Sequence, residues 1–414
     1  MSDVVLITIS GQDRAGLTSA LTGILANYDI NVLDIGQSVI HESLSLGILI
    51  ESPEVEKNSS ALDHSVFKDI LFKAHELNIT ARFTPVTKPE YEHWVNAQGK
   101  AKHIVTLLGR QITARHLARV TEVVTEHGFN IDQISRLSGR LSLDKTESSR
   151  GASVQLSLSG EVDDIAAMHS RFLQISQELD LDIAVQEDNL YRRSRRLVCF
   201  DMDSTLIQVE VIDELAKAAG VGEQVAAITE SAMRGEIDFS ESFRQRMALL
   251  EGMDESVLKD IAESLPITDG AARLISHLRH FGYKVAILSG GFTYFANYLK
   301  EKLGIDYVYA NQLDFEKGKL TGKVKGDIVD GQMKAKLLLK LAEEEGISPE
   351  QVIAVGDGAN DLPMLAIAGL GIAFHAKPIV KEQAKHSIAH LGLDSILYLL
   401  GMRDRELAEL ENIK

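Results

Sequence analysis

Two aspartates follow the apolar run LVCF in the stretch LVCFDMDSTL (197–206). Four apolar residues in a row are typical of a strand that is buried on both faces of a sheet. At this spacing, Asp201 could attack an electrophile while Asp203 transfers protons to and from the reacting oxygens. Two hydroxyl side chains, Ser204 and Thr205, come directly afterwards. The stretch therefore predicts chemistry at the end of a buried strand.

Polar residues and glycines also mark the ends of other apolar runs, KVAILS (284–289) and VIAVGD (352–357). Because ligands bind at the carboxyl ends of the strands of an open parallel sheet, we expect these residues to converge on one site. A lysine lies on the predicted helix before the second run. The set comprises Ser289, Gly290, Gly291, Lys334, Asp357, Asn360 and Asp361.

Several carboxylates at one sheet edge repel each other unless a cation neutralises them. Oxygen ligands without His or Cys favour Mg²⁺, held by a few carboxylates, water and a substrate phosphate. A hydroxyl followed by two glycines lets backbone N–H groups approach an anion, and a lysine adds a compact positive charge. These features predict a phosphoryl-transfer site in which Asp201 forms an aspartyl-phosphate and Asp203 is the acid and base.

A purely structural interpretation of the same residues is available. Asp201 could cap a helix and Asp203 could be an acid of its first turn. That interpretation does not explain why Ser289, Lys334 and Asp357 lie at matching positions beside other strands. The combined set therefore favours a functional site.

The C-terminal half alternates short apolar runs with helical stretches, which predicts a parallel sheet covered on both faces. About 60 residues of helical character, 207–270, separate the first two strands and could cover the site as a cap. The stretch QLDFEKGKLTGKV (312–324) predicts a β-hairpin with KGK at its turn. The predicted strands are 196–201, 284–289, 306–310, 352–357 and 370–374.

The first half contains a βαββαβ pattern that recurs 99 positions later, so that Asn31 aligns with Asn130. A repeat of this length predicts tandem domains rather than a solenoid. The stretch 84–102 is the predicted linker between them. The expected domains are 1–86, 100–188 and 192–400, with a C-terminal tail at 401–414.

Composition limits the function classes. The net charge of −17 argues against a nucleic-acid partner, which needs a basic face. The basic run RRSRR (192–196) is interpreted as a solvated linker, with a phosphate-binding tail as the alternative. The single cysteine, Cys199, excludes an intramolecular disulfide and is expected in the core. No segment resembles a membrane span, so the cytoplasm is the expected compartment.

The motifs DMDST (201–205), LSGG (288–291) and GDGAND (356–361) resemble those of the haloacid dehalogenase superfamily. Longer stretches, 201–216, 233–247 and 355–365, resemble the phosphoserine phosphatase family. The resemblance covers about 195–400. It implies an α/β fold, with a Rossmann-like parallel-sheet core and a helical cap insertion. It also implies hydrolysis of phosphoserine to serine and phosphate with Mg²⁺.

The resemblance also implies roles for the acidic residues. Asp201 would be the nucleophile and Asp203 the general acid and base. The carboxylates of Asp201 and Asp357 would bind Mg²⁺ together with the backbone carbonyl of Asp203. Asp361 would support the metal site from just outside it.

Substrate contacts are implied in the same way. Ser289, Gly290 and Lys334 would hold the phosphate, and Asn360 would contact the same region. Lys336 is a nearby competitor for the lysine role, but the family spacing to GDGAND favours Lys334.

The cap would supply specificity. Glu210 would meet the substrate ammonium and Arg246 its carboxylate, and Met233 and Phe239 would form an apolar wall that excludes water. On spacing alone, the first two are ordinary solvated residues and the last two are ordinary core residues.

The tandem N-terminal units resemble ACT domains, which often bind amino acids between paired copies. GQDRAG (11–16) and Asn31 carry the resemblance, with Asp13 and Asn31 as candidate ligand contacts. The second copy has GRQITAR (109–115) instead, although it keeps Asn130. The units are therefore expected either to bind an amino-acid effector or to serve only in dimerisation, and a homodimer is expected.

The predicted activity is a cytoplasmic, Mg²⁺-dependent phosphoserine phosphatase, a phosphoric monoester hydrolase of serine biosynthesis. One alternative is a phosphatase of the same fold for another small phosphoester, such as phosphohomoserine. Another is a non-catalytic amino-acid sensor.

Overall fold

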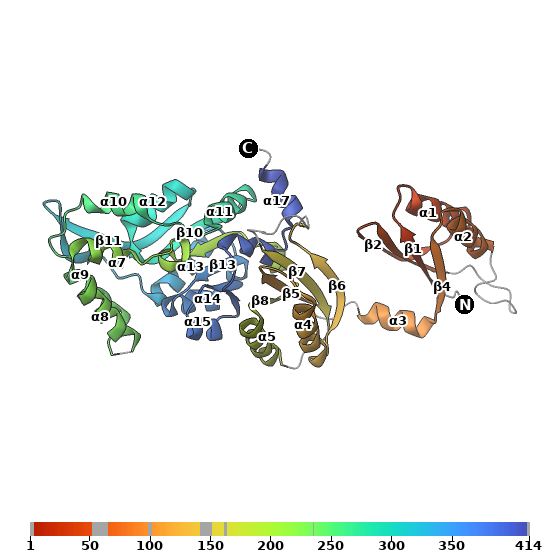
Figure 1. The fold of residues 1–414 in the computed structure, drawn as a ribbon, viewed down its shortest axis with the longest axis horizontal. Helices are drawn as coiled ribbons and strands as arrows, with labels where there is room; N and C mark the ends of the chain where they lie inside the picture. Colours follow the sequence, from red (N-terminus) through yellow and green to blue (C-terminus); the bar gives the residue numbers. More distant parts are fainter. Residues whose placement is uncertain are drawn as a thin grey trace. The chain divides into compact units, whose positions relative to one another are not determined.

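A computed structural model describes residues 4–51, 65–97, 102–140, 151–160, 164–234 and 236–411. The chain divides into two compact units, residues 1–100 and 101–414 (Figure 1). Among the helices in the described ranges, none is long and apolar enough to cross a membrane.

The first unit contains a four-stranded antiparallel sheet with the order β2-β3-β1-β4. Alternate residues of β1, such as Val5 and Ile7, are buried with Leu21 of α1 and Phe67 of α2 in one core. This confirms the βαββαβ fold of an ACT-like domain. The elements are β1 (Val4–Gln12), α1 (Leu17–Asn27), β2 (Val32–Ile40), β3 (Ser43–Glu51), α2 (Ser65–Glu76) and β4 (Thr80–Val86).

The stretch predicted as a linker contains a helix, α3 (Lys88–Ala97). Its start is fixed because Thr87 and Glu90 cap each other. The Thr87 backbone N donates to Glu90 Oε2 (2.8 Å), and the Glu90 backbone N donates to Thr87 Oγ1 (3.4 Å).

The second unit begins with the repeat of this fold, in the order β6-β7-β5-β8. Val105 and Leu107 of β5 are buried with Val120 and Val124 of α4 in one core. The fold is therefore a second ACT-like domain. Its elements are β5 (Lys102–Gly109), α4 (Ala114–Glu126), β6 (Asn130–Arg136), β7 (Ala152–Ser159), α5 (Ile165–Leu179) and β8 (Asp182–Glu187).

The remainder of the second unit, called the C-terminal part here, contains a seven-stranded sheet. Its order is β12-β11-β10-β9-β13-β14-β15, and every strand is parallel to its neighbours except β12. This confirms the predicted Rossmann-like core. The strands are β9 (Leu197–Phe200), β10 (Lys284–Phe292), β11 (Tyr307–Glu316), β12 (Lys319–Lys325), β13 (Val352–Gly356), β14 (Leu370–Phe374) and β15 (His386–Ile388).

The central strand β9 is buried on both faces. Val198 and Phe200 belong to one hydrophobic cluster and Leu197 and Cys199 to another. The chain continues from β9 to β10 and β11 on one side and returns through β13 on the other side. The strand order therefore switches direction beside β9, where open parallel sheets bind their ligands.

Four helices between β9 and β10 form the predicted cap (Figure 1). The predicted hairpin is present between β11 and β12, and Lys317 (φ 52°) and Gly318 (φ 78°) take left-handed conformations at its turn. The cap helices are α7 (Val211–Ala219), α8 (Gly222–Met233), α9 (Phe239–Ala248) and α10 (Val257–Ser264).

The other helices of the second unit connect and cover the strands of the C-terminal part. They are α6 (Leu190–Arg193), α11 (Ala271–His280), α12 (Thr293–Leu303), α13 (Gly331–Glu344), α14 (Leu362–Ile367), α15 (Pro378–Gln383), α16 (Ile396–Leu399) and α17 (Asp404–Glu411). Single turns are η1 (Met202–Leu206), η2 (Pro349–Gln351), η3 (Ala359–Asp361) and η4 (Leu393–Ser395).

The second ACT-like domain packs directly on the C-terminal part. The buried carboxylate of Asp182 accepts hydrogen bonds from the backbone N–H groups of Ala389 (2.9 Å) and His390 (3.0 Å). Gln186 Nε2 donates to Leu399 O (3.0 Å). Within the expected tail, the side chain of Asp404 on α17 accepts from the backbone N of Gly139 in the ACT-like domain.

The interpretation of RRSRR as a solvated linker was wrong. Arg192 and Arg195 are only 7% and 3% exposed. Arg192 donates to Gln155 Oε1 (3.2 Å) and lies beside Asp188, so this basic run is part of the packing between the two domains.

Candidate active site

The two aspartates of DMDST lie where β9 leaves the sheet. The backbone N of Asp201 donates to Val355 O of β13 (2.9 Å), and a tight turn, η1, follows. Within that turn Ser204 takes a left-handed conformation (φ 54°). Asp201 Oδ1 accepts from the Met202 backbone N (2.7 Å). Each carboxylate is therefore fixed by a backbone N–H, since Asp203 Oδ1 accepts from the Val211 backbone N (2.8 Å).

Lys334 of α13 connects two of the acidic residues. Its Nζ lies 2.8 Å from Asp201 Oδ1 and 2.6 Å from Asp361 Oδ1. Burial opposes the charge of Lys334, but the two carboxylates outweigh it and raise its pKa above the ordinary value. The other oxygen of Asp361 accepts from the Gly358 backbone N (2.9 Å), so both of its oxygens are engaged. Lys336, the competing lysine on the same helix, is exposed.

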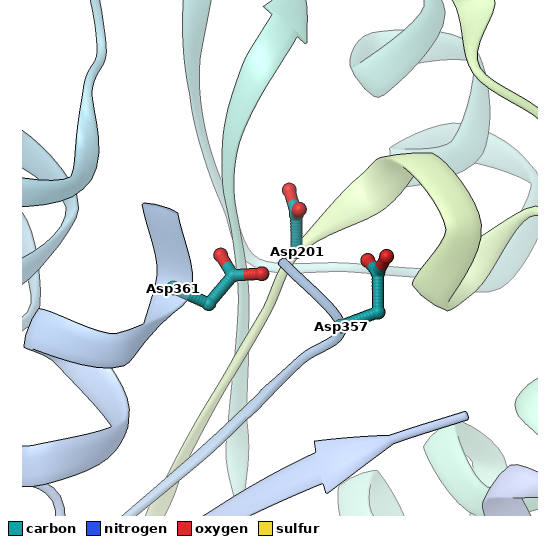
Figure 2. A group of neighbouring side chains, drawn as sticks. All are labelled: Asp201, Asp357 and Asp361. Atoms are coloured by element: carbon teal, nitrogen blue, oxygen red, sulfur yellow. The ribbon is translucent and has the colours of Figure 1, made fainter. Parts of the chain in front are cut away.

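Three carboxylates converge beside this lysine, as Figure 2 shows for Asp201, Asp357 and Asp361. Each offers an oxygen within 4.8 Å of the other two. Burial and the neighbouring charge of Asp361 raise the pKa of Asp201 well above its ordinary value and that of Asp357 to about 7. A hard divalent cation would relieve this repulsion, and a donor set made of oxygen atoms alone fits Mg²⁺.

Asp203 points into a different environment. A Cβ placed on Gly291 would overlap Asp203 Oδ2, so a glycine is required where the strand passes this carboxylate. Burial raises the pKa of Asp203, and the negative charge of Glu210 raises it further, to about 8. In the metal-free protein this carboxyl group therefore carries a proton near neutral pH, as a general acid requires.

The glycine-rich end of β10 is held in place by Asn311. Asn311 Nδ2 donates to Gly290 O (2.7 Å), and its Oδ1 accepts from the Val329 backbone N (2.8 Å). Ser289 is fully buried, and its Oγ accepts from the Gly291 backbone N (2.9 Å). The geometry of the turn is therefore set by a residue from the following strand.

A cavity of about 930 Å³ opens between the cap and the sheet edge. Asp201 and Asp203 lie in its wall, together with Glu210 and Arg246 from the cap. Ser204 Oγ donates to Glu210 Oε1 (2.9 Å) and orients this carboxylate. Further lining residues include Phe239, Gly290, Asp357 and Asn360.

Arg246 is partly buried in this cavity, and burial lowers its pKa while the charges of Glu210, Asp213 and Asp203 oppose that shift. It therefore faces acidic groups within the cavity. On the same helix, the ring of Phe239 stacks on that of Phe243 with 6.2 Å between centroids. The side chain of Met233 lies outside the described part of the structure.

The structure brings most predicted residues to one place, but in two layers. The cavity wall contains nine of them, Gly291 included, while Ser289, Lys334 and Asp361 lie buried beneath it. Sequence reasoning assigned no role to Thr205, whose Oγ1 donates to Asp357 Oδ1 (3.1 Å) and fixes that carboxylate. Its place directly after DMDS was the available signal. The sequence around Asn311 gave no such signal, because the hydrogen-bond partners of Asn311 are set by the tertiary fold.

Asp13 and Asn31, the candidate ligand contacts in the first ACT-like domain, form hydrogen bonds with different partners. Asn31 Nδ2 donates to Glu51 Oε2 (3.2 Å), and the Asp13 backbone N donates to Glu42 O (2.8 Å). In the second domain, Asn130 Nδ2 donates to Asp132 Oδ1 (2.8 Å).

Comparison with known families matches residues 195–369 to the haloacid dehalogenase-like hydrolases. Residues 3–84 and 101–186 match ACT domains. The chain is 39% identical over 409 residues to phosphoserine phosphatase of Streptomyces coelicolor, covering 98% of this chain and 94% of that protein. It belongs to the phosphoserine phosphatase family. A second family member, from Mycobacterium tuberculosis, is 38% identical over 403 residues, covering 97% of this chain and 94% of that protein.

Solved structures agree with this family assignment. A probable phosphoserine phosphatase from Vibrio cholerae superimposes with a TM-score of 0.56 at 36% identity, covering 77% of this chain and 90% of that one. A haloacid dehalogenase family hydrolase from Salmonella enterica superimposes with a TM-score of 0.62 at 29% identity. The superposition covers 72% of this chain and 98% of that one.

Proposed function

We propose that the chain hydrolyses O-phospho-L-serine to L-serine and phosphate. The observation that carries the proposal is a single cavity that joins Asp201 and Asp203 to Glu210 and Arg246. Phosphoserine presents a phosphate at one end and an ammonium and a carboxylate at the other. Two relatives that cover 97–98% of this chain, from Streptomyces coelicolor and Mycobacterium tuberculosis, are phosphoserine phosphatases.

The first half-reaction transfers the phosphoryl group to Asp201. Both hydrogen-bonding contacts of this carboxylate fall on Oδ1, so Oδ2 is the oxygen that attacks phosphorus. A bond forms between Asp201 Oδ2 and phosphorus while the bond from phosphorus to the serine oxygen breaks. Asp203 gives its proton to that departing oxygen, which leaves as the hydroxyl of serine.

The second half-reaction returns the enzyme to its starting state. Asp203, now ionised, takes a proton from a water molecule, and the water oxygen attacks phosphorus. The bond between phosphorus and Asp201 Oδ2 breaks, and inorganic phosphate is released. Because Asp203 acts first as acid and then as base, its raised pKa suits both steps.

The proposed cofactor is Mg²⁺, held by the carboxylates of Asp201 and Asp357 and the backbone carbonyl of Asp203. When bound, the cation neutralises phosphate charge that builds up during transfer. Thr205 fixes Asp357 for this role, and Asp361 acts through Lys334 and Gly358 rather than as a ligand.

Phosphate contacts are proposed for Ser289, Gly290, Lys334 and Asn360. Lys334 already neutralises Asp201, and the positive charge would also draw the phosphate oxygens toward the nucleophile. Gly290 and Asn360 line the cavity directly, so they are the proposed contacts from its surface.

Specificity is proposed to come from the cap. Glu210 pairs with the substrate ammonium, and the planar guanidinium of Arg246 pairs with the substrate carboxylate. Phe239 provides the apolar wall that excludes water from the cavity, and Met233 is proposed to do the same.

We propose that the chain is organised into domains at 1–86, 100–188 and 192–400. A cytoplasmic location and an amino-acid effector at the ACT-like domains are also proposed. A homodimer is proposed because the edge strand β2 exposes Ile35 and Ile40, which are 49% and 77% exposed. Sedimentation of the full chain tests that oligomeric state.

A phosphate-release assay tests the proposed reaction. The full chain with Mg²⁺ is given phosphoserine, phosphohomoserine and an aryl phosphate, and kcat/KM is compared. We expect phosphoserine to be the best substrate. A higher kcat/KM for phosphohomoserine would replace the proposed substrate. The absence of phosphate release from all three would identify a non-catalytic protein.

A further inference from the structure

A second cavity, of about 380 Å³, lies between the second ACT-like domain and the C-terminal part. One wall is formed by α5 and β8 of the ACT-like domain. The other wall is formed by residues 381–385 and 387, which span the end of α15 and the start of β15. It shares no lining residue with the active-site cavity.

The polar lining of this second cavity favours an anion. Lys381, Lys385 and His169 face it, against a single carboxylate, that of Glu382. Burial lowers the pKa of His169, and the charge of Lys385 lowers it further, so the two lysines carry the positive charge near neutral pH. An anionic group placed here would meet two ammonium groups within a partly desolvated cleft.

The rest of the lining is apolar and includes an unpaired hydroxyl. Phe172, Leu173, Ile183 and Val185 provide a hydrophobic wall beside the lysines. The Oγ of Ser387 is buried and has no hydrogen-bond partner among the described residues. A buried hydroxyl without a partner is unfavourable, and an anionic oxygen would accept a hydrogen bond from it.

We propose that this cavity binds a small organic carboxylate with an apolar body, and that the active site senses the binding through α15. The short helix reaches both cavities: Ile379 and Val380 line the active-site cavity, and Lys381 lines the second one. A ligand that contacts Lys381 therefore contacts the element that forms part of the active-site wall. A ligand can shift that wall only if it binds one position of α15 more tightly than another.

The test uses the full chain with phenylacetate as the probe. Phenylacetamide, which has the same shape without the charge, and acetate, which has the charge without the apolar body, are the controls. We expect phenylacetate alone to raise the melting temperature, because a ligand that binds only the folded state stabilises it. We also expect a change of about fivefold or more in KM or kcat for phosphoserine, the lower range of allosteric coupling.

Matched variants locate the binding. The double variant Lys381→Met with Lys385→Met should lose both responses, while Lys302→Met, on α12 and outside both cavities, should keep them. The melting response to phenylacetate does not depend on which substrate the enzyme hydrolyses. A failure of this proposed binding site can therefore be told apart from a failure of the proposed phosphoserine activity. An unchanged melting temperature with phenylacetate, or an equal rise in the double variant, overturns the proposed site.

Two further outcomes also contradict the proposal. Purely competitive inhibition that survives in the double variant and disappears in Arg246→Ala would place phenylacetate in the active-site cavity. A rise in melting temperature that the double variant abolishes, with unchanged KM and kcat, would overturn the coupling through α15.

Discussion

The ammonium nitrogen of Lys334 lies 2.8 Å from Oδ1 of Asp201, and both side chains are buried. The positive charge of Lys334 lowers the pKa of Asp201, against burial and the neighbouring carboxylates, which together raise it. The lysine and the Met202 backbone N both contact Oδ1, which leaves Oδ2 as the proposed attacking oxygen. The same lysine reaches Asp361, which makes it the shared counter-charge of the acidic cluster.

Replacing Lys334 by Met should therefore remove activity and destabilise the fold. Breaking a buried ion pair from one side costs about 3–5 kcal/mol of unfolding free energy. Denaturant unfolding measures that loss, with Lys336→Met as the control. Lys336 is exposed two positions along the same helix, so its change should stay within about 0.5 kcal/mol. Equal effects of the two variants would refute the role of Lys334.

Asp203→Asn should reduce kcat by about 10²–10⁴-fold, the usual contribution of general acid and base catalysis. The amide keeps the shape and can still contact the Val211 backbone N with its oxygen, so the melting temperature should change little. Steady-state phosphate release measures the effect. A change confined to KM would mean that Asp203 contributes only to binding.

Glu210→Gln and Arg246→Ala should impair phosphoserine turnover far more than turnover of an aryl phosphate, which has no ammonium or carboxylate. Each lost charged hydrogen bond should reduce kcat/KM for phosphoserine by about 10- to 100-fold. Arg244→Ala is the matched control, because Arg244 lies on the same helix but outside this cavity. Equal losses on both substrates would exclude these residues from specificity.

Mg²⁺ binding should weaken as the pH falls. The pKa of Asp357 is raised to about 7, so protons compete with the metal below that pH. Each proton displaced reduces the apparent affinity about tenfold per pH unit. The raised pKa also means that this group destabilises the metal-free fold as pH rises toward 7.

The increase in melting temperature on adding Mg²⁺, relative to a chelator-treated sample, should therefore be larger at pH about 7.5 than at pH about 5.5. Titration calorimetry over the same range measures the affinity directly. An affinity that does not change with pH would show that these carboxylates are not the ligands.

The sequence was sufficient to predict the cap, the hairpin and the parallel sheet except its edge strand β15, which was not predicted. Fully apolar strands such as 352–356 occur only where helices cover both faces of a sheet, and their carboxyl ends meet at one edge. That rule alone predicted that Asp201 and Asp357 lie close together. Lys334 was assigned to the same site because it lies on the predicted helix that precedes the strand 352–356.

Other features depend on tertiary contacts that local sequence does not encode. The run RRSRR reads as a solvated linker, but Arg192 is buried because the second ACT-like domain packs over it. Helix α3 was not predicted, because the whole stretch 84–102 was interpreted as a linker, although Thr87 and Glu90 form a local helix cap. Asn311 acquires its role only when β11 pairs beside β10.

Trapping the phospho-enzyme tests the central claim most directly. The full chain with Mg²⁺ is mixed with phosphoserine, quenched in acid within a turnover and digested with trypsin, and the peptide that follows Arg196 is sequenced by mass spectrometry. The proposed reaction requires one added phosphoryl group on Asp201, absent in Asp201→Asn, which should also release no phosphate while remaining folded. Phosphate release by Asp201→Asn at a near-normal rate, or a phosphoryl group found on Asp203 instead, would contradict the account.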